Sequence, residues 1–536
     1  MRTASGATGV QIAEYDSGRR KIVAHVGSAH TEAELGILLE RAREMLADPA
    51  QGSFDLGIEP AAPQVRLVAP APAPALFEAG PLAGTTAAGP PRAVSTDSRL
   101  LFQALDGVFG DLGFGALGDD VFRDLVLARV VEPASVLDTG RVLAELGRKA
   151  ASGKTMRRAL ARCADRGYRD KIAGLCFAHV LASGDISLVL YDVTTLYFEA
   201  GHEDGLRKVG YSKERRAGPQ VVAGLLADRR GFPLEIGCFE GNKAEKLTIL
   251  PAIRQFQARH GIEAVVVVAD AGMLPAGNLD DLDEAGPGFI VGSRVTKAPV
   301  GLESHFRWHG DAFTDGQVID TVTPKAGKNN DPALRAEPAW DRKDHPKSWR
   351  AVWAVSAKRL ARDNRTLTAQ ENRARDVISG AKSARAPRFV KTDGGTPALD
   401  EKALARARRL AGLKGYVTNL PVSVMPPAEV ISRYHDLWHV EQSFRMSKTD
   451  LAARPVFVRK RDAIEAHLTI VFTALAVARE TQNRTGLAIR NVIRQLRPLH
   501  SATIAVNGAV QTFPPAIGPE QQKILDDLKN GRDLRH

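Results

Sequence analysis

Two aspartates stand at the ends of apolar segments, where their carboxylates could bind a cation. Asp192 ends the run ISLVLYD, and Asp270 ends the run EAVVVVAD. Both runs are short and rich in Val, Ile and Leu, which is typical of buried strands. The chain leaves the packed core at the end of such a strand, so side chains there become accessible to ligands. An Asp in this place also commonly begins a turn, so neither residue alone identifies a binding site.

The pair of aspartates is more informative than either residue alone. Carboxylates at adjacent strand ends repel one another and are held together best by a divalent cation. A third ligand is expected, and Glu441 in the segment YHDLWHVEQSFRMSK is the candidate. Tyr434, Glu441 and Lys448 are spaced by seven residues in this segment, which predicts that they lie near one face of a helix. A Glu and a Lys on a helix are usually solvated charges, so this interpretation depends on its context.

Four segments together resemble the DDE-type insertion-sequence transposases, specifically the branch with a Tyr, Arg, Glu, Lys signature on its last catalytic helix (the IS-four superfamily, sixteen-thirty-four type). The segments are LVLYDVTTLYFEA around Asp192, VVVVADAGM around Asp270, YHDLWHVEQSFRMSK around Glu441, and GYSKERRAGPQVVAGLLADRRGFPLEIGCFEGN between the first two. Their order and spacing match the family, and the resemblance covers about residues 10 to 500. The signature's Arg position, three residues after Tyr434, is Leu437 here, which puts one expected phosphate contact in doubt.

The resemblance implies an α/β fold with a ribonuclease-H-like core. In this core the first Asp lies on the first strand, the second follows the fourth strand, and the Glu lies on a later helix. An inserted strand-rich α+β subdomain is implied between Asp270 and Glu441, and the long gap agrees. The implied cofactors are two Mg²⁺ ions held by Asp192, Asp270 and Glu441, with Mn²⁺ as a substitute, since hard oxygen ligands suit these ions better than zinc. The implied reaction is hydrolysis of a phosphodiester at each element end, followed by attack of the freed 3′-hydroxyl on target DNA.

The resemblance also indicates which residues contact DNA. Lys448 follows Glu441 by about two turns, where its ammonium could hold a phosphate, and Tyr434 could stack on the strand or bond to it. Arg445 is a further candidate in the same segment. The segment GYSKERR could offer a hydroxyl and cations to the DNA backbone, or be a plain basic hairpin tip; its candidates are Ser212, Lys213, Arg215 and Arg216. The expected partners are double-stranded DNA, as terminal inverted repeats and as target, and a second copy of the chain in a homodimer on DNA.

Changes of composition and periodicity divide the chain into seven segments. Strand-rich runs and a helix from Thr31 indicate an N-terminal strand and helix unit, and Ala/Pro/Gly-rich sequence after it indicates a linker. Helical spacing of apolar residues then predicts a helical region, which we assign to DNA-end binding. The core follows in two parts, separated by a basic α+β insertion, and the chain ends in a loosely ordered tail. The predicted bounds of these seven segments are, in order, 1–59, 60–96, 97–182, 183–295, 296–421, 422–500 and 501–536.

Charge and composition narrow the class of protein. The net charge is +11, and the stretch from Lys325 to Lys414 holds 22 Lys and Arg against 10 Asp and Glu, which favours either nucleic acid or a solvated surface. No apolar run reaches the ~18 residues of a membrane span, and the N-terminus lacks a signal peptide, so we expect a cytoplasmic, nucleoid-associated protein without a membrane partner. Cys163, Cys176 and Cys238 are too few and too scattered for a disulfide framework or a four-cysteine zinc site.

Three other functions are alternatives to this interpretation. The segment GRKAASGKT imitates a phosphate-binding loop, but Arg148 stands where Gly is needed, so no nucleotide cofactor is expected. A ribonuclease-H-like nuclease or resolvase would share the three carboxylates and release cut DNA without strand transfer. A non-catalytic DNA-binding descendant would keep the basic insertion and lose its metal dependence.

Overall fold

The computed structural model describes most of the chain after Pro91 and one β-hairpin before it. The described residues are 8–16, 19–29, 92–184, 186–198, 202–210, 218–270, 276–293, 302, 305–306, 310, 312–325, 339–383, 387–393, 396–506 and 509–530. The chain forms two compact units, Met1–Thr85 and Thr86–His536. In the first unit, β1 (Thr8–Asp16) pairs with β2 (Arg19–Ala29) in antiparallel fashion. The helix expected from Thr31 and most of the expected linker lie outside the described residues.

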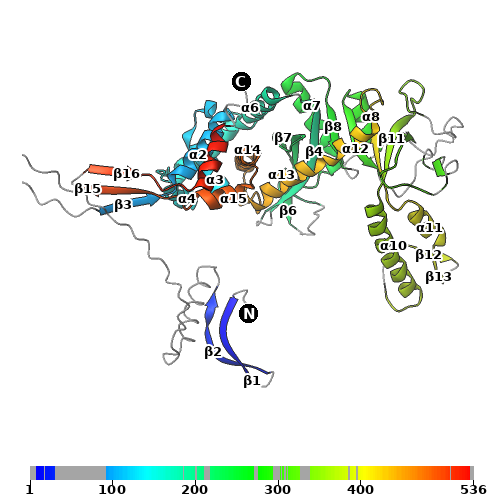
Figure 1. The fold of residues 1–536 in the computed structure, drawn as a ribbon, viewed down its shortest axis with the longest axis horizontal. Coiled ribbons are helices and arrows are strands. Elements are labelled where there is room, and N and C mark those ends of the chain that lie inside the picture. The colour runs from blue at the N-terminus through cyan, green and yellow to red at the C-terminus, as the bar shows by residue number, and fades with distance from the viewer. Residues whose placement is uncertain are drawn as a thin grey trace, which may run out of the picture. The chain divides into compact units, whose positions relative to one another are not determined.

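A nine-stranded mixed sheet forms the centre of the second unit (Figure 1). Its hydrogen-bonded order is β10-β11-β14-β9-β8-β4-β6-β5, and β7 also pairs with β6. Strands β4, β8 and β9 run parallel to one another, whereas β6 and β7 run antiparallel to their neighbours. The order β7-β6-β4-β8-β9 fits a ribonuclease-H-like core in which β4 is the first strand and β8 the fourth. The bounds are β4 Leu188–Tyr197, β5 Lys208–Val209, β6 Pro219–Asp228, β7 Pro233–Glu240, β8 Val266–Ala269, β9 Gly288–Ser293, β10 Val318–Pro324, β11 Ser348–Val355 and β14 Leu413–Thr418.

Helices make the crossovers that parallel strands require. The one-turn helix η2 (Glu245–Leu247) and α7 (Ile249–His260) connect β7 to β8, and α8 (Ala276–Glu284) connects β8 to β9. Parallel neighbours need such a connection because the chain must return to the same end of the sheet. The strand β6 is buried at all of its positions, which explains its nearly continuous apolar sequence.

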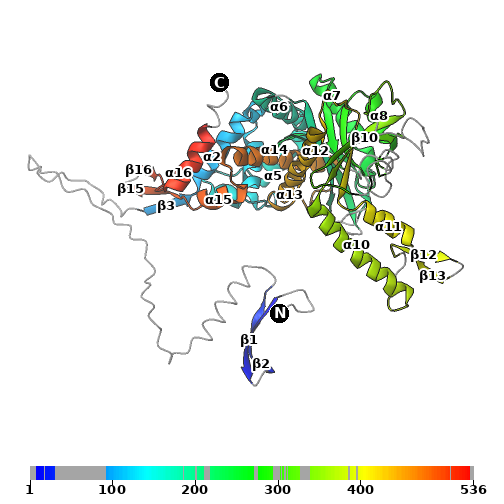
Figure 2. The ribbon, with the colours of Figure 1, turned by 45° about the vertical axis from the view of Figure 1, so that its right-hand side comes forward.

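A long buried helix joins the sheet to a helical region. Helix α14 (Arg461–Thr485) is buried along most of its length and packs against α2, α3, α5 and α6 as well as against β7 and α13 (Figure 2). Its apolar residues therefore surround it on all sides, as expected of a core helix. The helices before the sheet agree with the helical pattern of residues 97–182 and are α2 Arg99–Asp111, η1 Phe114–Leu117, α3 Asp120–Val131, α4 Thr139–Glu145, α5 Gly153–Asp165 and α6 Tyr168–Ser183.

The segment expected to form a separate inserted subdomain contributes three strands to the central sheet. Strand β14 pairs with β9 in antiparallel fashion, and β11 and β10 follow it outward. Between β11 and β14, residues 356–412 leave the sheet, and we call them the arm (Figures 1 and 2). The arm consists of α10 (Ala357–Ile378), the hairpin β12 (Val390–Asp393) and β13 (Thr396–Leu399), and α11 (Glu401–Arg409).

The C-terminal segment is more regular than its sequence predicts. Helices α12 (Pro427–His435), α13 (Leu437–Thr449), α14 and α15 (Ile489–Leu496) precede it. Strands β15 (Ser501–Val506) and β16 (Ala509–Phe513) then form a three-stranded sheet with β3 (Arg92–Asp97), followed by α16 (Pro519–Asn530). The prediction of a loosely ordered tail was wrong, as was that of a linker reaching residue 96, because β3 and β15 pair across about four hundred residues. Among the described residues, no helix is long and apolar enough to cross a membrane.

Candidate active site

Asp192 and Asp270 are placed side by side by the pairing of β4 with β8. These two strands run parallel, with Leu188, Val189 and Leu190 opposite Val266, Val267 and Val268. Continuing this register by two residues brings Asp192 on β4 beside Asp270, which directly follows β8. Neighbouring strands lie roughly 4.8 Å apart, so the two carboxylates lie close together where β8 ends. The prediction that Asp192 also ends its strand was wrong, because β4 continues from Asp192 to Tyr197 in its pairing with β6.

The two carboxylates differ in their surroundings. Asp192 is partly buried, and its Oδ1 accepts a hydrogen bond of 2.8 Å from the backbone N–H of Val193. Asp270 is exposed, and its Oδ1 accepts a hydrogen bond of 2.9 Å from the hydroxyl of Tyr434. Each carboxylate therefore has one oxygen fixed by a donor of the chain itself.

Tyr434 is the residue that links the last helices to this strand edge. It lies in α12, is only 9% exposed, and packs against Tyr416 with ring centroids 4.9 Å apart. Burial, the charge of Asp270 and the hydrogen bond to it all raise the pKa of Tyr434 above its ordinary value. The hydroxyl therefore stays protonated and acts as a donor to Asp270.

Glu441 approaches the same region from α13. This helix packs against β4 and β6, and Glu441 is exposed on it. The negative charge of Glu441 is the smallest of the causes that raise the pKa of Tyr434, so Glu441 is near enough to act on Tyr434 electrostatically. The single helix expected through Tyr434 and Glu441 is wrong, because α12 ends at His435 and α13 begins at Leu437, with Asp436 between them.

Among the described residues, no three His, Cys, Asp or Glu side chains lie close enough together to hold a metal ion. The donor chemistry nevertheless fits a hard divalent cation. Asp192 and Asp270 present carboxylate oxygens from adjacent strands, and two neighbouring carboxylates are best stabilised by a shared cation.

Replacing Tyr434 by Phe is expected to lower the rate of any reaction at this site by about ten- to a hundredfold, since a hydrogen bond to a charged group contributes about 1.5–3 kcal/mol. The change removes the donor to Asp270 Oδ1 and leaves the ring packed on Tyr416. The turnover rate of this variant would be compared with that of a Tyr197→Phe control, a partly exposed tyrosine at the end of β4. An equal loss of rate in both variants would contradict a positioning role for Tyr434.

Two residues beside Tyr434, Lys414 and Gly292, were not predicted from the sequence. Lys414 on β14 holds its Nζ 5.1 Å from the ring centroid of Tyr434. Burial and the charge of Arg359 lower the pKa of Lys414, whereas Asp270 acts in the opposite direction. A Cβ added at Gly292 on β9 would overlap the Tyr434 hydroxyl and lie 3.2 Å from Lys414 Nζ, so only Gly lets both groups approach this strand. In the sequence, the feature that could have pointed to Lys414 is its position inside the strand-like run LKGYVT.

A buried arginine fixes α13 against the sheet. Arg479 of α14 is 3% exposed and donates hydrogen bonds to the carbonyl oxygens of Arg230, Gly231 and His439, at 2.7, 3.2 and 3.4 Å. Ser443 of α13 donates a bond of 2.6 Å to the same Gly231 oxygen. The turn between β6 and β7 therefore meets α13 and α14 at one point. The α13 residues at this point are His439 and Ser443, which lie two residues before and two residues after Glu441.

The other residues predicted to contact DNA differ in their exposure, and four of them lie outside the described residues. Arg445 is exposed on α13, and Lys448 is half-buried with its Nζ 6.0 Å from the centroid of the Phe444 ring. Leu437, which occupies the signature's Arg position, is 6% exposed and belongs to the main hydrophobic core. The remaining candidates lie outside the described residues and are Ser212, Lys213, Arg215 and Arg216.

Comparison with known proteins identifies a family and distantly similar solved structures. The family described as "Transposase DDE domain" matches residues 183–477, which contain Asp192, Asp270 and Glu441. No curated protein matches the chain. Among solved structures, the piggyBac transposase in a synaptic complex with hairpin DNA is similar, with 10% sequence identity and a TM-score of 0.36 over 77% of this chain and 82% of that one.

Proposed function

The chain belongs to the family of transposases with a DDE domain, and from this premise we propose that it cleaves phosphodiester bonds at the ends of an insertion sequence and joins the freed 3′-hydroxyl to target DNA. The observation that carries the proposal is the lateral pairing of Asp192 with Asp270 through the parallel register of β4 and β8. The Tyr, Arg, Glu, Lys branch of these transposases is the proposed relative, with Leu437 in place of the Arg.

Asp192, Asp270 and Glu441 are the proposed ligands of two Mg²⁺ ions, and Mn²⁺ should substitute because all donors are hard oxygens. When bound, the ions supply Lewis-acid stabilisation of negative charge on the phosphate oxygens and a more acidic bound water. The chain's own part is to hold the carboxylates in place. Tyr434 fixes one oxygen of Asp270, so we assign it a positioning role rather than the stacking on DNA considered from its sequence.

Cations on and near α13 are the proposed contacts with the DNA strand. Arg445 is exposed and Lys448 is half-buried on the helix that carries Glu441, so both can reach a phosphate near the carboxylates. Double-stranded DNA, as element ends and as target, is the proposed partner, and joining two ends calls for a homodimer on DNA. Such a protein would be associated with the nucleoid.

The decisive experiment separates strand transfer from simple cutting. Duplexes carrying the repeats that flank the coding sequence, already cut to expose their 3′-hydroxyls, would be incubated with the full chain, Mg²⁺ and a supercoiled plasmid. Covalently joined end and plasmid products are expected. Cutting of uncut ends without any joined product would instead favour a nuclease or resolvase, and binding with neither reaction would favour a non-catalytic descendant.

A further inference from the structure

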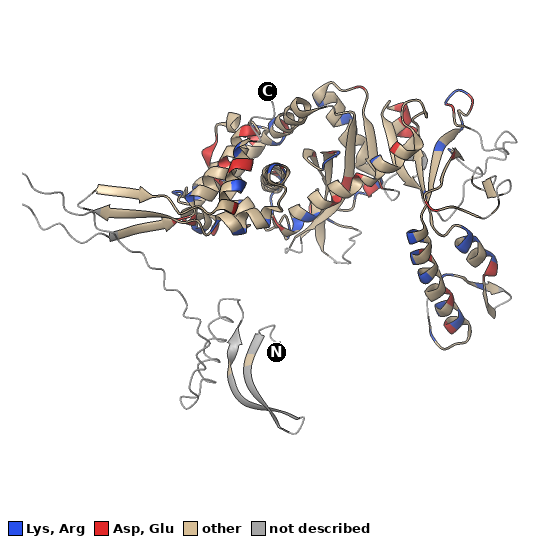
Figure 3. Cartoon of the chain, in the orientation of Figure 1, with Lys and Arg blue, Asp and Glu red and all other residues tan. Residues whose placement is uncertain are grey.

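Most of the chain's excess positive charge lies in the arm. Residues 357–411 contain 14 Lys and Arg against six Asp and Glu, an excess of eight charges in a chain whose net charge is +11. Figure 3 shows Lys and Arg distributed along α10 and α11. A solvated surface that only keeps a protein soluble needs both signs interspersed rather than one sign concentrated on one element.

Four of these cations form a stripe along one side of α10. Lys358, Arg362, Arg365 and Arg373 are all exposed and are separated by four, three and eight residues. At 3.6 residues per turn, these positions fall within about 80° around the helix axis. The buried residues of the helix, Leu367 and Ala374, fall on the opposite side. The helix thus packs on the arm's small apolar core with one face and presents the cationic stripe with the other.

The acidic residues of α10 are already engaged. The carboxylate of Asp363 accepts a bond of 3.2 Å from the Gly412 backbone N–H and lies 3.7 Å from Arg359. Glu371 pairs with Arg375 and Arg408 at 2.8 and 2.6 Å, and Asp376 pairs with Lys382 at 2.7 Å; these partner cations lie outside the stripe. Within the stripe, Arg362 also pairs with this helix, since its Nη2 lies 3.6 Å from Asp363 Oδ1. The carboxylates of α10 therefore compensate the charge of the stripe only in part.

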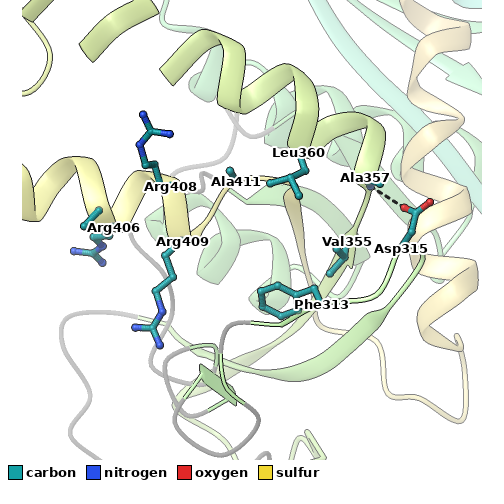
Figure 4. Close-up of a pocket in the computed structure, with 10 residues that line it drawn as sticks. Phe313, Asp315, Val355, Ala357, Leu360, Arg406, Arg408, Arg409 and Ala411 are labelled. Carbon is teal, nitrogen blue, oxygen red and sulfur yellow. Dashed lines mark hydrogen bonds between the residues drawn. The ribbon is translucent and has the colours of Figure 1, made fainter. Parts of the chain in front are cut away.

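The base of the arm is fixed to the sheet. The backbone N–H of Ala357, the first residue of α10, donates a bond of 2.7 Å to Asp315 Oδ1 (Figure 4). The Ser356 hydroxyl caps the same helix by accepting a hydrogen bond from the Arg359 N–H. A cavity of about 880 Å³ opens beside this point, and α11 lines it with three further arginines, Arg406, Arg408 and Arg409 (Figure 4). The stripe consequently starts from a defined place on the sheet.

That place adjoins the candidate active site. The chain returns from the arm into β14, and Lys414 stands at the second position of this strand, beside Tyr434. The charges of Arg359 and Asp270 both act on Lys414. Cations therefore continue from the neighbourhood of Asp270, through Lys414 and Arg359 at the start of α10, to the stripe.

We propose that the stripe of Lys358, Arg362, Arg365 and Arg373 binds the phosphate backbone of the DNA duplex that extends from the active site. The identity of the ligand as DNA rests on the proposed function, whereas the site rests on the charge and geometry of the arm. From Lys358 to Arg373 the helix rises about 22 Å, which equals about six base pairs of B-form DNA. Contacts of this kind position a duplex without reading its sequence.

The salt dependence of DNA binding tests this proposal. The full chain would be titrated with duplex DNA in metal-free buffer at several salt concentrations, so that no cleavage interferes. The double variant Arg362→Gln, Arg365→Gln is expected to lower the slope of log Kd against log salt by about 1.8, since each lost phosphate contact accounts for about 0.9. The variant Arg362→Lys, Arg365→Lys keeps both charges and should keep the slope.

A matched control removes two exposed cations from another helix of the chain. Lys523→Gln, Lys529→Gln on α16 should leave the slope unchanged. An unchanged slope in the Arg362→Gln, Arg365→Gln variant, with circular dichroism showing an intact fold, would overturn the proposal. So would an altered sedimentation coefficient without DNA, since the stripe would then bind a second copy of the chain. Failure of cleavage by the unaltered chain in Mg²⁺ would count against the proposed function alone.

Discussion

Replacing Asp270 by Asn is expected to lower the rate of DNA cleavage by about three orders of magnitude while leaving DNA binding close to that of the unaltered chain. Asn has nearly the same shape and can still accept the hydrogen bond from Tyr434. It lacks the negative charge that a divalent cation requires, and metal-ion stabilisation of the transition state contributes several kcal/mol, at 1.4 kcal/mol for each factor of ten. Asp192→Asn and Glu441→Gln should have effects of the same order.

The three variants would be compared by their single-turnover cleavage rates in Mg²⁺. Their binding to the same DNA would be measured separately in metal-free buffer. Glu520→Gln, which neutralises an exposed acid on α16, is the matched control and should cleave at the unaltered rate. Rapid cleavage by any one of the three variants would remove that residue from the assigned set of ligands. The Glu441 variant is the most informative of the three. Strand pairing brings Asp192 and Asp270 together, whereas Glu441 comes near them through the packing of α13 against β4 and β6.

Arg479→Met is expected to reduce the free energy of unfolding by about 1–3 kcal/mol, the cost of one unsatisfied buried group. The substitution removes the donor to the Arg230 carbonyl oxygen, whereas the Gly231 and His439 oxygens keep the Ser443 hydroxyl as a donor. Unfolding in urea, followed by circular dichroism, would give the difference. Arg461→Met in the same helix, where the arginine is exposed and pairs with Glu465, should change stability by less than about 0.5 kcal/mol.

The same junction should also affect the reaction, because it holds α13 against the turn between β6 and β7. Ser443→Ala removes one hydrogen bond to the Gly231 oxygen and creates no steric conflict, so a loss of about 1 kcal/mol in stability is expected. Its cleavage rate should fall more than that of a surface variant of equal stability. Unchanged cleavage by a folded Ser443→Ala chain would show that the position of Glu441 does not depend on this contact.

The local parts of the candidate site could be read from the sequence. The runs before Asp192 and Asp270 predict two buried strands ending in a carboxylate. This is confirmed for β8, which ends directly before Asp270, but it is wrong for β4, which continues past Asp192 to Tyr197. Hydrophobic periodicity also predicts the helical region before the sheet. That β4 and β8 lie next to one another came from the family resemblance, because the pattern of a single strand does not specify its neighbour. The family match to residues 183–477 supports the resemblance to DDE transposases.

Features that depend on contacts distant in sequence could not be predicted in this way. Spacing by seven suggested one helix through Tyr434 and Glu441, yet the chain turns at Asp436 and packs Tyr434 against the sheet. Lys414 gains its surroundings from β9, α12 and the start of α10, which are separate in the sequence. The strands β10, β11 and β14 similarly have ordinary strand sequences, and only pairing with β9 shows that they extend the core sheet.

The closure of the arm at its base has an evolutionary consequence. The backbone N–H of Ser356 donates a bond of 3.0 Å to the carbonyl oxygen of Gly412, so the chain departs from the sheet and returns to it at neighbouring points. Changing the length of a segment whose ends already meet costs little loop entropy, about 0.6 kcal/mol for each doubling. The register of β11 against β14 does not depend on what lies between them. The arm can therefore become shorter or longer without disturbing the strands that place Asp192 beside Asp270. If the stripe binds DNA as proposed, such changes would alter the contacts with DNA and leave the paired aspartates in place.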